Sequence, residues 1–439
     1  MKKILLFGAG KSSSFLIKYL IQHAAENNWV VQIVDQNTKH IQDKYGVVNH
    51  LQLFTTDVFN NAERAELIQH AELVISLLPP SLHIVVAKDC LLYAKNLITA
   101  SYVSDEIKAM DAELKEKKVL FMCEMGLDPG IDHMSAMKII DEIAKENGEI
   151  FEFKSHCGGL VAPESDTNPW HYKISWNPRN VITAGAVGAH FLFNKQEYKI
   201  DYPQIFKNNQ TIQVNGIGQL AYYPNRDSLS YQALCDLKNV DTLERTTLRY
   251  PAYSAAWQYI IDMGLTNEKS KLYDTENLTF EAWLQDVLQT NNVAEKLNFI
   301  FGNDEASQKL FDYLDLTSRQ FINIGTQKSN ADILQSVIEQ KWKMQDTDKD
   351  MIVMQHEFKY RKAGKATYLK STLIVKGEDK TYTAMAKTVG LPMAILAKLI
   401  LTEKVTALYG VNIPVMQKVY APVLQELVEQ GIIFEEEIV

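Results

Sequence analysis

The sequence predicts an α/β fold with two α/β domains, the second of which carries an all-helical insertion. Three observations support this prediction. Apolar, strand-like runs alternate with amphipathic segments over the first 125 residues, strand-like runs mixed with aromatic residues follow, and residues 254–345 show helical patterns alone. A chain of 439 residues is also too long for one ordinary hydrophobic core.

Six apolar runs in the first 125 residues have the length and composition of buried strands. They cover residues 4–7, 29–34, 51–54, 73–78, 97–100 and 119–122. Amphipathic segments connect most of them, and this alternation is typical of a parallel sheet covered by helices on both faces.

The first run ends in a glycine-rich turn, "FGAGKSSS". Gly8 and Gly10 allow a tight turn and the close approach of a pyrophosphate to backbone N–H groups, and a helix beginning near Ser12 offers its N-terminus to that anion. Ser13 replaces the third glycine of the GxGxxG pattern, so a plain strand-to-helix turn is the alternative interpretation. The position after the first of six strands favours a Rossmann dinucleotide-binding domain over residues 1–125.

The second run ends in an acidic residue, in "WVVQIVDQ". Asp35 is placed to accept hydrogen bonds from both hydroxyls of an adenosine ribose and to repel a 2′-phosphate, and no arginine follows it directly. We therefore predict NAD as the cofactor, with NADP as second choice; a surface turn is the alternative role of Asp35. The predicted cofactor contacts in this domain and directly after it are Gly8, Gly10, Lys11, Ser12, Ser13, Asp35, Asp57, Leu78, Pro79, Ser101 and Gly126.

The stretch "MGLDPGIDH", residues 125–133, follows the sixth predicted strand and precedes a helix. Asp128 lies before Pro129, which favours an extended conformation, and at the edge of the sheet where open α/β folds bind ligands. Asp132 has a structural explanation as the N-cap of the helix, with Gly148 as its C′ residue. His133 lacks a third ligand nearby, so we predict no metal site.

Ser101 and Tyr102 follow the fifth predicted strand, in "ITASYVS". A hydroxyl and a phenol at this edge could reach a substrate, and turn residues are the alternative interpretation.

The rest of the chain divides by pattern. Strand-like runs predict a second α/β domain, which we expect to bind the substrate, over residues 126–253 and 346–384, interrupted by the helical insertion at 254–345. Two closing helices within residues 385–439 are expected to return and pack on the first domain.

Composition excludes several classes of protein. The net charge of −9, without a basic stripe, argues against nucleic acid as a partner. No apolar run reaches the roughly 18–20 residues of a membrane span, so we expect no membrane partner. The cysteines, which lie far apart and form no CxxC pair, predict a reducing, cytoplasmic location and no zinc site; they are Cys90, Cys123, Cys157 and Cys235.

Several long strings resemble one family. The stretches "VISLLPPSLH", "TASYVS", "MGLDPGIDHMSAMKIID", "CGGLVAPESDTNPWHYKISW", "YPNRDS" and "TTLRY" are similar to those of saccharopine dehydrogenase, glutamate-forming, and the resemblance covers essentially the whole chain. It implies an enzyme of lysine metabolism that oxidises L-saccharopine to L-glutamate and 2-aminoadipate 6-semialdehyde, or runs the reverse reductive condensation. It also implies a small-molecule substrate and a homodimer.

The resemblance further implies site residues. Saccharopine has three carboxylates, and arginine binds a carboxylate bidentately. The implied substrate contacts are Ser101, Tyr102, Asp128, Cys157, Gly158, Arg226, Thr247, Leu248 and Arg249. Asp128 and Tyr102 are candidates for proton transfer, and simple pairing of Asp128 with the substrate amine is the alternative. Cys157 is expected to be a small wall of the site rather than a nucleophile. Trp176 is expected on the nicotinamide side, with a core tryptophan as the alternative.

Two positions depart from the family pattern. The fungal biosynthetic form carries a basic residue after the second strand and uses NADP, whereas Asp35 is closer to the NAD-using degradative form. Pro80 replaces the usual tyrosine after the first proline of "LLPP". The alternatives to a saccharopine dehydrogenase are a carboxynorspermidine dehydrogenase-like imine reductase of polyamine synthesis and a cofactor-binding protein that has lost catalysis.

Overall fold

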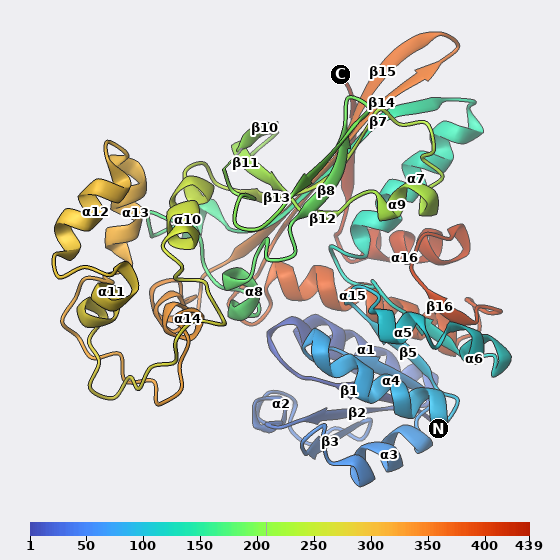
Figure 1. Ribbon diagram of the computed structural model, residues 1–439. Coiled ribbons are helices and arrows are strands. Elements are labelled where there is room, and N and C mark those ends of the chain that lie inside the picture. The colour runs from blue at the N-terminus through green and yellow to red at the C-terminus, as the bar shows by residue number, and fades with distance from the viewer. Residues whose placement is uncertain (208) are drawn as a thin grey trace. The chain divides into compact units, whose positions relative to one another are not determined.

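The computed structural model describes residues 1–207 and 209–439 and divides into two compact units (Figure 1). The first unit comprises Met1–Asn147 and Gly377–Phe434, and the second comprises Gly148–Lys376 and Glu435–Val439. Both contain a β-sheet with helices, and the first sheet is parallel throughout. The predicted α/β class is therefore confirmed.

The first sheet has seven strands in the order β16-β6-β5-β4-β1-β2-β3. Their bounds are β1 Lys2–Phe7, β2 Trp29–Asp35, β3 Leu51–Thr55, β4 Leu73–Ser76, β5 Asn96–Thr99, β6 Leu120–Met122 and β16 Gly410–Asn412. The first six correspond to the six predicted strands. The seventh, β16, was not predicted, because three residues are too few to show a strand pattern.

Eleven helical segments accompany this sheet among the described residues. They are η1 Lys11–Ser13, α1 Ser14–Asn27, α2 Lys39–Tyr45, α3 Asn61–His70, η2 Pro80–Leu82, α4 His83–Leu92, α5 Asp105–Lys108, α6 Asp111–Glu116, α7 Ile131–Lys145, α15 Ala384–Leu401 and α16 Gln417–Glu429. Helix α15 lies against α1. A Cβ at Gly390 would come within 3.1 Å of Leu16, so glycine permits this close approach.

Helix α15 is also the one helix of the described residues that is long and apolar enough to cross a membrane by length and composition. The sequence was expected to contain no segment of this kind, because Lys387 and Lys398 interrupt its apolar residues. Of the 18-residue window, 78% is buried inside the protein, and buried core helices pass the same criterion.

The boundaries of the two units differ from the predicted domain ranges. Residues 126–147 lie in the first unit, because α7 buries Met134 and Ile140 there and Asp141 accepts a hydrogen bond from the Tyr420 hydroxyl of α16. Residues 435–439, expected on the first domain, belong to the second unit, where β17 joins the sheet.

The second sheet has ten strands, with the main order β10-β11-β13-β7-β14-β15-β17; β8, β9 and β12 lie off this path, and β8 pairs with β13. The bounds are β7 Glu149–Val161, β8 Ala189–Phe193, β9 Gln196–Ile200, β10 Gln210–Val214, β11 Gly218–Pro224, β12 Arg226–Asp227, β13 Thr242–Arg249, β14 Asp350–Lys362, β15 Lys365–Lys376 and β17 Phe434–Ile438. Side chains alternate between the two faces along each strand, so the register fixes which residues share a face.

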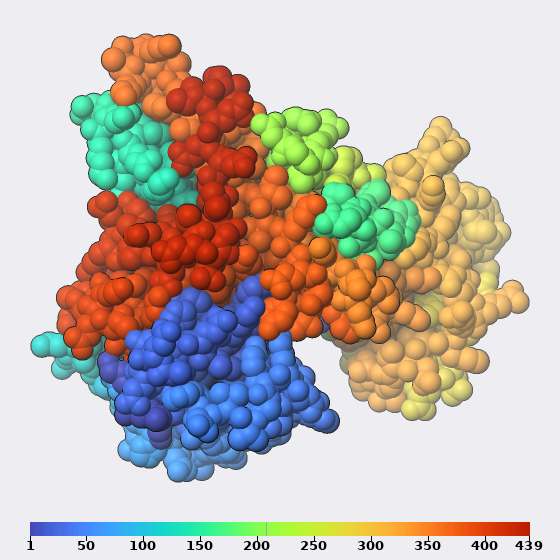
Figure 2. Space-filling model, turned by 180° about the vertical axis from the view of Figure 1, so that it is seen from behind, coloured from blue at the N-terminus to red at the C-terminus, as the bar shows by residue number. Residues whose placement is uncertain are grey.

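The helices of the second unit are η3 Pro163–Ser165, α8 Pro178–Ile182, α9 Ser230–Leu234, α10 Tyr253–Asp262, α11 Phe280–Leu288, α12 Val293–Phe301, α13 Glu305–Tyr313 and α14 Asn330–Lys341. Helices α10 to α14 follow one another between β13 and β14, and α11 to α13 gather in one group (Figure 1). This part of the chain, coloured yellow and light orange, forms one lobe of the molecular surface (Figure 2). Its core contains the buried rings of Trp170, Trp257 and Trp342.

One face of the second sheet carries a buried carboxyl group. Glu244 on β13 is 3% exposed, and this burial raises its pKa to about 7. The negative charges of Glu152 and Glu357 also raise the pKa, whereas the positive charge of Lys154 lowers it. The folded protein therefore holds a proton on Glu244 at a pH where the unfolded chain, with its ordinary pKa of 4.5, has lost it.

We expect this difference to make stability depend on pH. The contribution of Glu244 is fully present below pH 4.5 and is lost as pH rises toward 7, by up to about 3 kcal/mol. The variant Glu244→Gln lacks this pH dependence. The free energy of unfolding of the wild type minus that of the variant should therefore fall as the pH rises from 4.5 toward 7. Denaturant unfolding at several pH values measures it, with the exposed Glu435→Gln as the charge-matched control. A wild-type-to-variant difference that stays constant with pH would contradict the expectation.

Candidate functional site

The turn after β1 has the features that a pyrophosphate needs. Gly8 has φ +95°, and a Cβ there would lie 2.8 Å from the carbonyl oxygen of Leu77. At Gly10 nothing lies within 4 Å of a Cβ position, so the backbone is open to a ligand. Ser13 is buried, and its hydroxyl donates to the Gly10 carbonyl at 2.8 Å, which explains how a serine fits where the pattern has glycine.

Asp35 ends β2 and contacts this turn directly. Its Oδ2 accepts from the Ala9 N–H at 2.7 Å, and its Oδ1 accepts from the Asn37 N–H at 3.0 Å. His40 adds a second link, because its Nε2 lies 2.8 Å from the Ala9 carbonyl oxygen, a contact that sequence patterns did not suggest. Each carboxylate oxygen has a further lone pair, so these bonds leave Asp35 able to accept from a ribose.

The other predicted cofactor residues of the first unit lie on the turn or near strand ends. Asp57 follows β3 and accepts from Gln36 Nε2 at 3.0 Å. Lys11 and Pro79 are exposed, Ser12 and Leu78 are half-buried, and Gly126 is buried. An open glycine turn, the N-terminal end of the η1–α1 segment and a carboxylate at the end of β2 together fit a dinucleotide.

The two candidates for proton transfer are hydrogen-bonded to each other. The Tyr102 hydroxyl donates to Asp128 Oδ1 at 3.2 Å, and both residues are half-buried. The loop that carries Asp128 closes through the Gly126 N–H, which donates to the Pro129 carbonyl at 3.0 Å. The Asp128–Pro129 peptide bond is cis.

Three buried side chains behind this loop form a polar cluster. Glu124 Oε2 lies 2.8 Å from His133 Nε2, and His133 Nδ1 lies 3.3 Å from Asp132 Oδ2. Asp132 is not the N-cap that the sequence predicts: α7 begins at Ile131, so Asp132 lies in its first turn and accepts from the Gly130 N–H at 2.6 Å. The C-terminal prediction was also wrong, because Asn147, not Gly148, takes the left-handed conformation there.

Sequence patterns missed Glu124, whose signal was only its place directly after a predicted strand. Its Oε1 accepts from the Val103 N–H at 3.2 Å, so it ties the segment after β5 to the segment after β6. Within residues 1–207 and 209–439, no group of three or more His, Cys, Asp or Glu is arranged to hold a metal ion.

In the second unit, the register of the sheet groups some of the predicted substrate residues on one face. Thr247 of β13 lies opposite both Cys157 of β7 and Tyr223 of β11, and Arg249 follows two residues later on the same face. Gly158 and Leu248 point to the other face. Leu248 belongs to a hydrophobic cluster there, so only its backbone, whose carbonyl accepts from Arg249 Nη1 at 2.8 Å, shares the side of Arg249.

Arg249 is a buried cation surrounded by phenols. Its guanidinium carbon lies 5.3 Å from the ring centres of Tyr172 and Tyr253 and 5.8 Å from that of Tyr223. Among the described residues no carboxylate pairs with it, and its Nε has no hydrogen-bond partner. A buried charge without a counter-ion is costly, so this group is suited to bind an anionic ligand.

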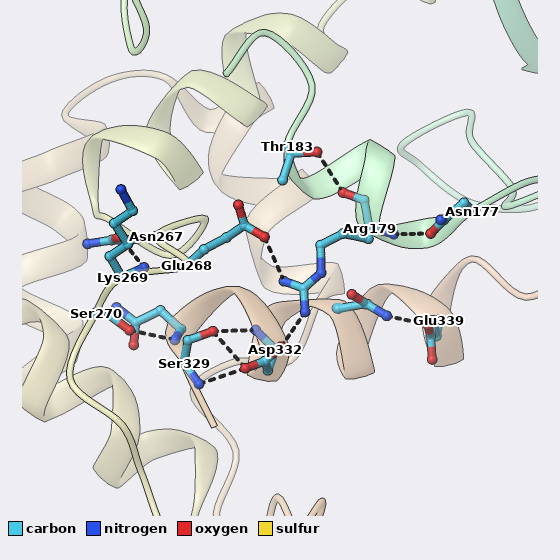
Figure 3. Close-up of polar contacts among 12 residues, drawn as sticks. Asn177, Arg179, Thr183, Asn267, Glu268, Lys269, Ser270, Ser329, Asp332 and Glu339 are labelled. Carbon is cyan, nitrogen blue, oxygen red and sulfur yellow. Dashed lines mark hydrogen bonds and ion pairs between the residues drawn. The ribbon is translucent and has the colours of Figure 1, made fainter. Parts of the chain in front are cut away.

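Trp176 lies beside this group of phenols, because its Nε1 donates to the Tyr172 hydroxyl at 3.1 Å. Figure 3 shows how the next segment is held: Arg179 of α8 pairs with Asp332 of α14 and lies 3.6 Å from Glu268. The other predicted arginine, Arg226, is exposed on β12 with φ +57°. The sequence did not single out the tyrosines of this group, since nothing local distinguishes them from core residues.

Comparison with known proteins places the chain in a family. Residues 126–432 match the family model described as the saccharopine dehydrogenase C-terminal domain, and residues 4–122 match the saccharopine dehydrogenase NADP binding domain. The chain belongs to the saccharopine dehydrogenase family. The resemblance inferred from the sequence is therefore confirmed.

Individual relatives agree with this family. The chain is 33% identical over 99% of its length to the mitochondrial alpha-aminoadipic semialdehyde synthase of Mus musculus, and it spans 47% of that protein. It thus covers about half the length of this relative. It is 29% identical to the Schizosaccharomyces pombe saccharopine dehydrogenase [NADP(+), L-glutamate-forming], covering 99% of it. The solved apo saccharopine dehydrogenase (L-Glu forming) of Saccharomyces cerevisiae matches with 27% identity and a TM-score of 0.87, over 100% of both chains.

The loop that holds Asp128 depends on Gly130. Gly130 has φ +145°, and a Cβ there would overlap with the backbone of Gly126. We expect Gly130→Ala to lower the free energy of unfolding by at least about 3 kcal/mol, since strain and overlap add. Gly364→Ala is the matched control, because Gly364 has φ +80° but nothing within 4 Å of its Cβ position, and it should cost about 1 kcal/mol. Denaturant titration compares the two, and equal losses would contradict the steric account.

Proposed function

We propose that this protein catalyses the nicotinamide-dinucleotide-dependent oxidation of L-saccharopine to L-glutamate and 2-aminoadipate 6-semialdehyde, or the reverse reductive condensation. The observation that carries the proposal is the buried Arg249 guanidinium, which has a free Nε and no acidic partner among the described residues. Full-length similarity to the yeast saccharopine dehydrogenase supports saccharopine, a tricarboxylate, as the anion that it binds.

The reaction requires a proton to leave the substrate amine. A bound nicotinamide would supply a hydride acceptor for the lysine ε-carbon of saccharopine, and hydrolysis of the resulting imine would give both products. Asp128 accepts the amine proton in this proposal, and the hydrogen bond from Tyr102 orients its carboxylate. The alternative role for Asp128 is to pair with the substrate ammonium without taking its proton.

The substrate carboxylates need fixed cations and donors. Arg249 is preorganised, because three phenol rings and the Leu248 carbonyl hold its guanidinium. Thr247 adds a hydroxyl on the same face, and Cys157 directly opposite it forms a small wall. Arg226, exposed on β12, is proposed to supply a second guanidinium to the substrate.

The choice between NAD and NADP rests on opposing observations. The matched domain description and the names of the fungal relatives favour NADP. The Asp35 carboxylate favours NAD, because it would repel a 2′-phosphate beside the Gly8–Gly10 turn. We propose that NAD is the preferred cofactor and that Asp35 determines this preference.

The proton-transfer proposal predicts a large effect at Asp128. Asp128→Asn should lower kcat/KM for saccharopine by about 10²–10⁴-fold, and Tyr102→Phe by a smaller factor, because the carboxylate acts directly and the phenol orients it. Initial rates of reduced-cofactor formation against pH measure both, with exposed Asp105→Asn as control. Asp128→Asn with near-wild-type rates would remove Asp128 from this role. Wild-type oxidation of carboxynorspermidine instead of saccharopine would overturn the proposed substrate.

The cofactor proposal predicts a shift at Asp35. Asp35→Ser should raise the ratio of kcat/KM with NADP to that with NAD at least about tenfold, because it removes the repulsion of the 2′-phosphate. Asp43→Ser, which removes an exposed carboxylate of α2, is the charge-matched control. An unchanged ratio in Asp35→Ser would show that another residue sets the preference.

A further inference from the structure

A chain of hydrogen bonds leads from the buried Ser76 through His83 to Ser101 within the first unit. His83, the first residue of α4, has its Nδ1 2.8 Å from Ser76 Oγ and its Nε2 2.8 Å from Ser101 Oγ. Ser76 ends β4, and Ser101 follows the end of β5. Thr99 Oγ1 lies farther from the ring, at 3.2 Å from Nε2 and 3.4 Å from Nδ1. The imidazole therefore bridges the two serines.

The burial of His83 limits what this bridge can be. The side chain is 3% exposed, and desolvation lowers its pKa to about 4, so the ring is neutral near pH 7. A neutral imidazole has one N–H donor and one acceptor nitrogen. One serine must therefore donate to the ring, and the other must accept from it.

The surroundings of Ser76 decide which serine donates. Ser76 is 0% exposed, and within residues 1–207 and 209–439 His83 is the one hydrogen-bond partner of its hydroxyl. If Nδ1 carried the proton, the Ser76 hydroxyl hydrogen would be buried without an acceptor, which is costly. Ser76 thus donates to Nδ1, and the Nε2–H donates to Ser101. The Ser101 hydroxyl, already an acceptor, has its own hydrogen left to donate.

We propose that His83 is a positioning residue that makes Ser101 a hydrogen-bond donor and so selects an acceptor oxygen of the bound ligand. This inference rests on the proposed function for the presence of a ligand at Ser101. Either of two groups could supply this acceptor oxygen: a carboxylate of the substrate or the carboxamide of the nicotinamide. In either case an ammonium, which can only donate, is disfavoured at Ser101, because it would leave the hydroxyl hydrogen without an acceptor.

Two variants of His83 test the roles of its two ring nitrogens separately. In His83→Gln the amide N–H takes the place of Nε2–H and keeps the donor to Ser101, whereas in His83→Asn the amide reaches only toward Ser76. We expect His83→Gln to stay within about threefold of wild type. His83→Asn should raise either the KM for saccharopine or the Kd of the cofactor about tenfold, with a smaller change in kcat. The affected constant identifies the source of the acceptor oxygen.

The background of Ser101→Ala separates positioning from a merely structural role. If His83 acts through Ser101, His83→Asn should add no further loss in Ser101→Ala. The same added loss in both backgrounds, or equal losses for His83→Asn and His83→Gln, would overturn the proposal.

A second measurement reads the tautomer of His83 directly in the wild-type protein. Nitrogen-15 chemical shifts of histidine-labelled wild-type protein report which ring nitrogen carries the proton, with the signal of His83 identified by its loss in His83→Gln. Protonation at Nε2 supports the proposal, and protonation at Nδ1 overturns it. If the wild type binds cofactor but does not oxidise saccharopine, the proposed function fails while this tautomer assignment stands on its own result.

Discussion

The parallel pairing of the first sheet is the constraint on which the nucleotide-binding unit depends. Because β1, β4, β5 and β6 run in the same direction, their carboxyl ends meet at one edge. Each end then contributes a different group: the Gly8 turn, the His83 bridge through Ser76, the pair of Ser101 and Tyr102, and the loop of Asp128. Hydrogen bonds, such as that from the Val103 N–H to Glu124, join these neighbours into one polar layer.

The second unit applies a different constraint to its candidate site. Its sheet is mixed, and the register of β7, β11 and β13 places Cys157, Thr247 and Tyr223 in one row. Beyond that row the structure buries Arg249 among phenol rings, with no carboxylate partner within the described residues. A buried cation in such surroundings lowers the stability of the free protein, and a bound carboxylate would offset that cost.

Much of the fold followed from local pattern. The first six strands of the first unit, β1 to β6, and the helical stretch between β13 and β14 have strong periodicity, so their type and order were predictable. The short β16 has no such signal, since its place beside β6 comes from pairing across nearly three hundred positions of chain. The start of α7 was misplaced, because Gly130, with φ +145°, takes the N-cap position that the sequence assigned to Asp132.

The sequence by itself determined the class of fold, the glycine turn with Asp35, and the family, because these are carried by contiguous residues. Only the tertiary structure decided that Tyr102 donates to Asp128, that His83 joins Ser76 to Ser101, and that Arg249 lacks an acidic partner among the described residues. These relations link positions that are distant in sequence, and burial sets their energies. A local sequence pattern gives neither the distance between two residues in space nor their burial.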